Sequence, residues 1–275
     1  MKIYLGPGGI GIGAKERTTI GGIKYVAEIG LNSLECEFVR KVYLTEKTAP
    51  EIGDKAKELG ILLTSHAPYA INLCSNAKNV VEASKGMILD TLKISEIIGA
   101  GCAATHIAYY SGLKPEQAIE TLKVNIGDII DKTKQMGIKN VKLGIEIMAK
   151  ESQFGTLDEV ISLCKQVKGV VPYIDWCHIF VRNNGKINYS EIFDKLKVLK
   201  LDHIYSHFSN AKYNVDTKKF VDVHVPIDSH PPFESLAKEI LERKVDVSIV
   251  SESPILELDS IKMKKIFEKL GYKFS

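Results

Sequence analysis

The chain alternates between short apolar runs and longer amphipathic segments over its whole length. Short apolar runs bounded by polar positions are typical of parallel strands that are buried on both faces. The pattern predicts eight strands, at residues 2–5, 33–39, 61–65, 103–108, 141–148, 171–176, 203–208 and 246–251.

The segments between these runs carry helix start and stop signals. Proline in a first turn and glycine just past the last periodic residue predict helices at 50–59, 80–98, 115–136 and 261–270. Thr156 and Glu159 form a capping box that starts another helix. Because no Pro/Ser-rich linker interrupts this alternation, we predict an α/β fold with one domain over residues 1–275, a (β/α)8 TIM barrel.

Side chains that can bind a metal ion follow most of the predicted strands. A barrel of parallel strands gathers the carboxyl ends of its strands around one axis, so side chains far apart in the sequence converge there. Imidazole and carboxylate groups are the ligands that zinc and similar divalent ions prefer. Nine candidates, too many for one ion, stand at or just after these ends: His66, His106, Glu146, Asp175, His178, His207, Asp222, His224 and Glu252.

Local spacing distinguishes these candidates from ordinary core or surface residues. A single histidine at a strand end is usually structural, but Asp222 and His224 lie two positions apart and therefore share one face of an extended segment. Glu146 stands inside an apolar run, where a carboxylate is costly unless it meets a cation. The pattern therefore predicts an enzyme with several metal ions.

Residues 6–11 match the Gly-x-Gly-x-x-Gly pattern directly after the first predicted strand, which alone would indicate a dinucleotide site. In such a site the third glycine opens a helix. Here helical periodicity begins only near Thr19. We therefore predict a flexible loop at the rim of the active site.

The composition narrows the class of protein. Apolar residues make up 45% of the chain, which suffices for a large core. The formal net charge of +3 neither requires nor excludes a nucleic-acid partner. Five cysteines without a CxxC pair favour a reduced, cytoplasmic protein. No apolar run approaches the ~20 residues of a membrane span, so we expect no membrane partner.

Four motifs at the predicted strand ends resemble those of the endonuclease IV family of apurinic/apyrimidinic endonucleases, within the xylose-isomerase-like barrel superfamily. They are Ser65-His66-Ala67-Pro68-Tyr69, Asp175-x-x-His178, Ser206-His207-Phe208-Ser209-Asn210 and Ser251-Glu252-Ser253-Pro254. The similarity extends from about the second predicted strand to the eighth. Every ligand of the family's trinuclear zinc site has a matching residue in this chain.

The resemblance implies three zinc ions per chain, with manganese possible at some positions. The first ion would be held by His66, His106 and Glu146, the second by Glu146, Asp175, His207 and Glu252, and the third by His178, Asp222 and His224. It also implies hydrolysis of damaged duplex DNA 5′ to an abasic site, with Glu146 as the catalytic bridging ligand. Metal-bound hydroxide would attack phosphorus, so no catalytic serine or cysteine is expected.

The chain departs from the family at positions that bear on DNA binding. Val223 stands where the family has arginine, and Ala70 where it can carry a leucine that wedges into DNA. Ile107-Ala108 replaces a Pro-Gly pair. We expect these changes to leave metal binding intact and to weaken DNA binding. The candidate DNA-contacting residues are Tyr69, Arg40, Lys41, Lys150 and Lys212.

Two other functions are compatible with the same fold. A sugar isomerase or epimerase of this superfamily would use one metal ion and a quartet that resembles Glu146, Asp175, His207 and Glu252. Two carboxylates would then serve as acid and base. That scheme leaves the remaining five candidates without a role. The other alternative is a protein that binds metal or nucleic acid without catalysis.

Overall fold

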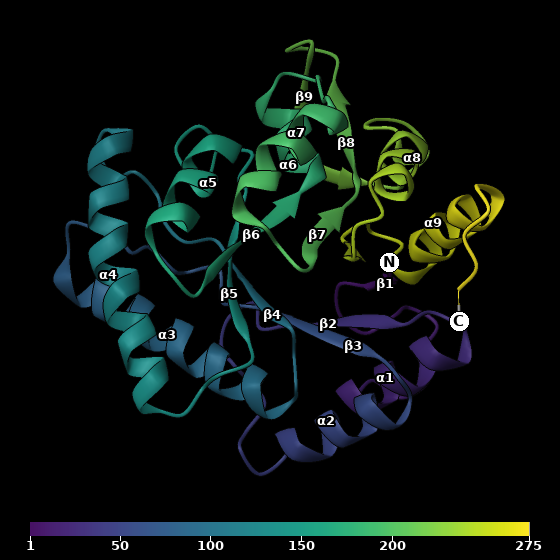
Figure 1. The fold of residues 1–275 in the computed structure, drawn as a ribbon, viewed down its shortest axis with the longest axis horizontal. Helices are drawn as coiled ribbons and strands as arrows, with labels where there is room; N and C mark the ends of the chain where they lie inside the picture. Colours follow the sequence, from purple (N-terminus) through teal and green to yellow (C-terminus); the bar gives the residue numbers. More distant parts are fainter. Residues whose placement is uncertain (275) are drawn as a thin grey trace.

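Eight parallel strands form a barrel at the centre of the computed structural model, which describes residues 1–274 (Figure 1). They are β1 (Ile3–Pro7), β2 (Ser33–Glu37), β3 (Leu62–His66), β4 (Cys102–Thr105), β5 (Lys142–Glu146), β6 (Val170–Asp175), β7 (Ile204–Phe208) and β10 (Val247–Ser251). Their order is β1-β10-β7-β6-β5-β4-β3-β2. The predicted barrel and its eight strands are confirmed, with strand ends that differ by at most three residues.

The barrel closes between β1 and β2 through a side chain. Asn32, just before β2, accepts a hydrogen bond from the Leu5 amide (2.7 Å) and donates one to the Ile3 carbonyl (3.0 Å). Further along, Gly8 and Glu35 form a single parallel bridge. Gly6 permits this close approach, since an added Cβ would lie 1.7 Å from the Ser33 carbonyl oxygen.

Helices surround the barrel and follow most of its strands (Figure 1). They are α1 (Thr19–Glu28), α2 (Ala49–Glu58), α3 (Lys78–Ile97), α4 (Pro115–Gln135), α5 (Leu157–Gln166), α6 (Trp176–Arg182), α7 (Tyr189–Leu196), α8 (Phe233–Arg243) and α9 (Glu257–Lys269), with a 3-10 turn at Lys197–Leu199. The predicted capping box is present, because Thr156 accepts from the Glu159 amide and Glu159 accepts from the Thr156 amide. Among residues 1–274, no helix combines the length and apolarity of a membrane span.

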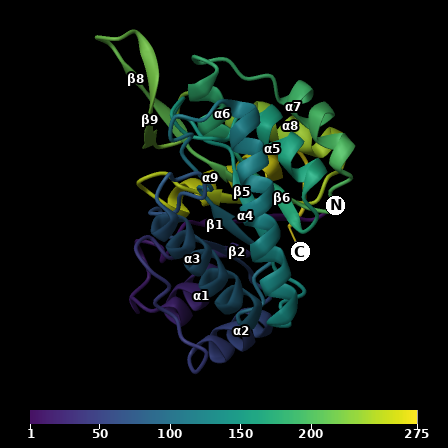
Figure 2. The same cartoon turned by 90° about the vertical axis from the view of Figure 1, so that its left-hand side faces the viewer.

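A hairpin that the sequence pattern does not predict lies between β7 and α8. Its strands β8 (Asn210–Asn214) and β9 (Lys219–Val225) pair antiparallel, and Figure 2 shows them extending beyond the helical layer. Most of its residues are at least partly exposed, so it lacks the apolar run that marks a buried strand. The hairpin nevertheless carries two of the candidate metal ligands.

The glycine-rich loop is held by an internal carboxylate. The Ile12 and Gly13 amides each donate to a different oxygen of Glu257 at 2.8 Å, and Glu257 is 1% exposed. Helix α1 begins at Thr19, as predicted. Two amides of the type that would bind phosphate in a dinucleotide site are therefore already used within the protein.

Candidate metal centre

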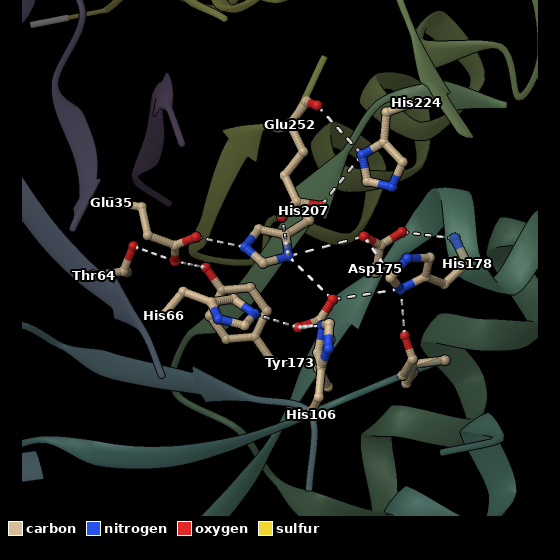
Figure 3. A network of polar contacts seen from close by, with 12 residues as sticks. Glu35, Thr64, His66, His106, Tyr173, Asp175, His178, His207, His224 and Glu252 are labelled. Atoms are coloured by element: carbon tan, nitrogen blue, oxygen red, sulfur yellow. Dashed lines mark hydrogen bonds and ion pairs between the residues drawn. The ribbon is translucent and has the colours of Figure 1, made fainter. Parts of the chain in front are cut away.

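The nine candidate ligands converge at the carboxyl end of the barrel, although they come from seven segments of the chain. Figure 3 labels His66, His106, Asp175, His178, His207, His224 and Glu252. His66, Glu146 and Asp175 are the last residues of β3, β5 and β6, and His207 lies near the end of β7. His106 and Glu252 directly follow β4 and β10. His178 comes from α6, and Asp222 and His224 come from β9.

Glu146 lies at the middle of the centre and is fully buried. Its Oε2 faces His66 Nε2 at 2.9 Å and His106 Nε2 at 3.2 Å. Its Oε1 faces the Nδ1 atoms of His178 and His207, each at 3.4 Å. Each oxygen of this carboxylate therefore faces different candidate ligands, His66 and His106 on one side and His207 on the other, as a bridging ligand requires.

A second group of ligands stands around α6 and the hairpin. Asp175 caps α6 by accepting the His178 amide at 2.6 Å, which explains the three-residue spacing of this pair. Asp222 Oδ1 lies 3.3 Å from His178 Nε2 and 3.7 Å from His224 Nε2. The alternation of β9 thus points Asp222 and His224 to one side, as the sequence predicts.

The ligand atoms form four sets in which all atoms lie within 4.8 Å of one another, a spacing that suits a cation. Three sets consist of predicted ligands: His66, His106 and Glu146; Glu146, Asp175, His207 and Glu252; and Asp175, His178 and His224. The fourth is Glu35, Glu37 and Glu252, and Asp222 belongs to none of the four. Four buried atoms of these candidate ligands have no hydrogen-bond partner: Glu146 Oε1, Asp175 Oδ2, His207 Nδ1 and Glu252 Oε2. Because unpaired buried polar atoms are costly, their convergence fits a site for positive ions.

Backbone carbonyl groups orient two of the imidazoles. His66 Nδ1 donates to the Ala67 carbonyl at 2.7 Å, and His178 Nδ1 donates to the Ile147 carbonyl at 2.9 Å. A carbonyl oxygen can only accept, so the proton of each neutral ring lies on Nδ1. Nε2 of each ring therefore faces a carboxylate, Glu146 for His66 and Asp222 for His178, and a metal ion would take the place of the proton there.

Burial and mutual charge shift the pKa values of these groups in the protein alone. Burial opposes the charged form of His66, but Glu146 outweighs it and raises the pKa to about 10. Burial also opposes the charged form of His224, whose pKa is raised to about 9, chiefly by Asp222 and Glu252. Burial raises the pKa of Glu252 to about 7. Metal binding would therefore have to displace protons from the centre.

The prediction from sequence misses two carboxylates on β2. Glu35 and Glu37 lie two positions apart on the inner face of the strand, and both approach Glu252. Burial raises the pKa of Glu37 to about 8. The signal was present, because Leu34-Glu35-Cys36-Glu37-Phe38 places charges in an apolar run as the Glu146 segment does.

Four of the five candidate DNA-contacting residues follow the carboxyl end of a barrel strand, and Lys212 lies on the hairpin. Arg40 and Lys41 are exposed after β2, and Lys212 is exposed on β8. Lys150 Nζ lies 3.5 Å from Asp222 Oδ2. Tyr69 is half-exposed, and its ring stacks on His106 with 5.1 Å between centroids.

Cys177 takes no part in the centre, although two candidate ligands flank it. It lies on α6, and the helix directs its side chain away from the centre. Its side chain packs with Phe180 and Ala211. Burial raises the pKa of its thiol to about 12, which makes it a poor nucleophile.

Comparison of the sequence with known families and proteins gives consistent matches. The profile of the xylose isomerase-like TIM barrel family matches residues 23–267. "Uncharacterized protein MJ0133" of Methanocaldococcus jannaschii is 27% identical over 98% of both chains. "Probable endonuclease 4" of Mycoplasmopsis synoviae is 28% identical over 70% of this chain and 69% of its own.

Solved structures share the fold across two kinds of enzyme. Endonuclease IV from Thermus thermophilus superposes with a TM-score of 0.70 at 16% identity, covering 98% of each chain. A D-tagatose 3-epimerase-like protein superposes with a TM-score of 0.72 at 17% identity, covering 98% of this chain and 96% of its own. At these identities the structures establish the fold and do not choose between the two activities.

Proposed function

Because the chain belongs to the xylose isomerase-like TIM barrel family, we propose that it is a metal-dependent phosphodiester hydrolase that incises duplex DNA 5′ to abasic sites. The proposal assigns three divalent ions, zinc with manganese possible at some positions, to the nine ligands. The observation that carries it is the presence of three adjoining donor sets that share Glu146 and Asp175.

The charge of the centre supports several ions. Six carboxylates surround it: Glu35, Glu37, Glu146, Asp175, Asp222 and Glu252. Fully ionised, they would repel a phosphodiester, which is itself an anion. Three divalent cations would balance these six charges, whereas a single ion would leave a strongly negative centre.

The chain's own residues would bind and orient the reacting groups. When bound, the metal ions would supply a hydroxide near neutral pH and positive charge for the phosphoryl oxygens. Glu146 would be a ligand of two of the ions, because it belongs to two of the donor sets. His178, Asp222 and His224 would hold the third ion at the foot of the hairpin, where β9 faces solvent.

A second function has a specific observation in its favour. Glu146, Asp175, His207 and Glu252 form one complete donor set, which is the quartet expected of a single-metal sugar epimerase. In that case His66, His106, His178, Asp222 and His224 would lack a ligand role. Their close contacts with one another and with Glu146 favour the hydrolase.

The test compares both reactions on one preparation. A labelled duplex with a single abasic analogue is incubated with the purified protein beside an undamaged duplex, with and without chelator, and a panel of ketoses is assayed in parallel. We expect incision of the damaged strand only, abolished by chelator. Affinity should be modest and should fall steeply as salt rises, because phosphate contacts release counterions.

The other outcomes select the alternatives. Interconversion of a ketose without strand cleavage would replace the proposal with the epimerase. Binding of DNA or metal without either reaction would leave a non-catalytic role. Elemental analysis of protein purified without chelator should find two to three metal ions per chain on the hydrolase scheme, and one on the epimerase scheme.

A further inference from the structure

Glu35 lies in the barrel interior, and both of its carboxylate oxygens accept hydrogen bonds from other side chains. It lies in the middle of β2 and has no exposed surface. Its Oε1 accepts from His207 Nε2 at 2.7 Å (Figure 3). Its Oε2 accepts from Thr64 Oγ1 at 2.8 Å and from Tyr173 Oη at 2.7 Å. Glu35 also lies near Glu37 and Glu252. Its two oxygens, however, already accept hydrogen bonds from His207, Thr64 and Tyr173.

The other nitrogen of His207 faces the metal centre. His207 Nδ1 has no hydrogen-bond partner and lies 3.4 Å from Glu146 Oε1 and 3.5 Å from Glu252 Oε1. An ionised carboxylate can only accept a hydrogen bond, so the Glu35 contact places the proton of a neutral His207 ring on Nε2. The lone pair then lies on Nδ1 and points at the centre.

His207 differs in this respect from two of its neighbours. Backbone carbonyls orient His66 and His178 through Nδ1, so that Nε2 faces the carboxylates of the centre. His207 is oriented through Nε2 by a side chain and offers Nδ1 instead. The Tyr173 ring also packs on His207, with 4.5 Å between centroids, so one residue supports both Glu35 and the imidazole.

We propose that Glu35 is a positioning residue that holds His207 in the tautomer and orientation needed to bind the central metal ion. Thr64 and Tyr173 hold Glu35 in turn, so β2, β3 and β6 together present a ligand that belongs to β7. This inference rests on the proposed metal centre but not on the identity of the substrate. Partners of this kind contribute about 10- to 100-fold to metal affinity.

The test measures stepwise zinc affinities of the whole protein by competition with a chromophoric chelator. Glu35→Gln keeps the size of the side chain but cannot accept from all three donors. We expect one zinc equivalent to bind about 10- to 100-fold more weakly while the others are unchanged. Tyr173→Phe should weaken the same zinc equivalent by less, about threefold, because it removes one of the three contacts of Glu35 and leaves the contact with His207. Glu257→Gln is the control for loss of a buried carboxylate elsewhere.

Thermal unfolding of the metal-free variants separates positioning from a structural role. Unchanged zinc affinities in Glu35→Gln would overturn the inference. It would also be overturned if every zinc equivalent bound more weakly to the same extent and the unfolding temperature of the variant fell in parallel. If Glu35→Gln does not fold, Glu35→Asp takes its place, and it should weaken the same single equivalent. A wild-type protein that binds no metal would overturn the metal centre as well. One that binds three ions but cuts no abasic duplex would overturn only the proposed function.

Discussion

Glu146 is the side chain on which the candidate metal centre most depends, because each of its oxygens faces a separate pair of imidazoles. Burial alone would keep this carboxyl neutral, but the surrounding histidines, His106 first among them, hold its pKa well below the usual range. The residue is therefore charged where an apolar side chain would normally stand. Its environment is built to receive further positive charge.

Replacing this carboxylate tests whether it joins two metal positions. Glu146→Gln is expected to lose two metal equivalents together, since an amide is a much poorer bridge between cations. Elemental analysis of the purified variant measures the loss, with Glu257→Gln as the control. Loss of a single equivalent would show that Glu146 serves only one ion.

His178 tests the third metal position. If this ion stabilises charge on the phosphate, His178→Ala should lower turnover by roughly 100-fold or more while the protein stays folded. The matched control is His203→Ala, because His203 stands before β7 at the opposite end of the barrel. Turnover and the unfolding temperature are measured for both variants. A normal turnover number for His178→Ala would remove the third ion from the mechanism.

At the scale of elements, the hairpin formed by β8 and β9 joins the centre to the surface. Asp222 and His224 point from β9 toward His178, and Val223 between them is 48% exposed. Lys212 lies on the partner strand. A strand that alternates between candidate metal ligands and exposed positions can thus influence both the proposed catalysis and substrate binding.

Restoring a cation on this strand should strengthen DNA binding. Val223→Arg is expected to lower the Kd for an abasic duplex and to steepen its dependence on log salt by about one unit, since one more phosphate contact releases about one counterion. The control is Val124→Arg, which adds the same charge at an exposed position on α4. Equal gains in both variants would indicate a general charge effect and would exclude a role for position 223.

At the scale of the whole molecule, the protons held by the centre couple metal binding to stability. In the folded, metal-free protein the pKa values of His66 and His224 are about 10 and about 9, above their usual value of about 6.5. That of Glu252 is about 7, above its usual value of about 4.3. Folding therefore favours the protonated form of all three groups.

The pH dependence of the metal-free protein follows from these shifts. A raised folded pKa contributes stability that is complete below the unfolded pKa and is lost as pH rises through the folded one. We expect the unfolding temperature of the chelated protein to fall between about pH 6.5 and about pH 10 through the two histidines, and Glu252 to begin the loss already above about pH 4.3. The metal-loaded protein should be protected over that range, because bound cations replace the protons. A chelated protein whose unfolding temperature stays constant would contradict these shifts.

The amino-acid sequence by itself determined the barrel and the set of candidate ligands. Parallel strands buried on both faces must be apolar, so a histidine or a glutamate such as Glu146 in such a run stands out without any coordinates. The alternation of an extended segment likewise placed Asp222 and His224 on one face. Both features depend only on residues that are close together in the sequence, so the local pattern of apolar and polar positions is enough to predict them.

Only the tertiary structure decided how these groups are joined. The contacts of Glu35 with His207 and of Glu257 with the glycine-rich loop each link residues more than a hundred positions apart, and no local periodicity records such a pairing. The hairpin was missed because its exposed strands need no apolar run. His66, His178 and His207 each have one nitrogen that donates to an oxygen and one that faces the centre. The closed barrel decides which oxygen lies near each ring, and therefore which nitrogen faces the centre.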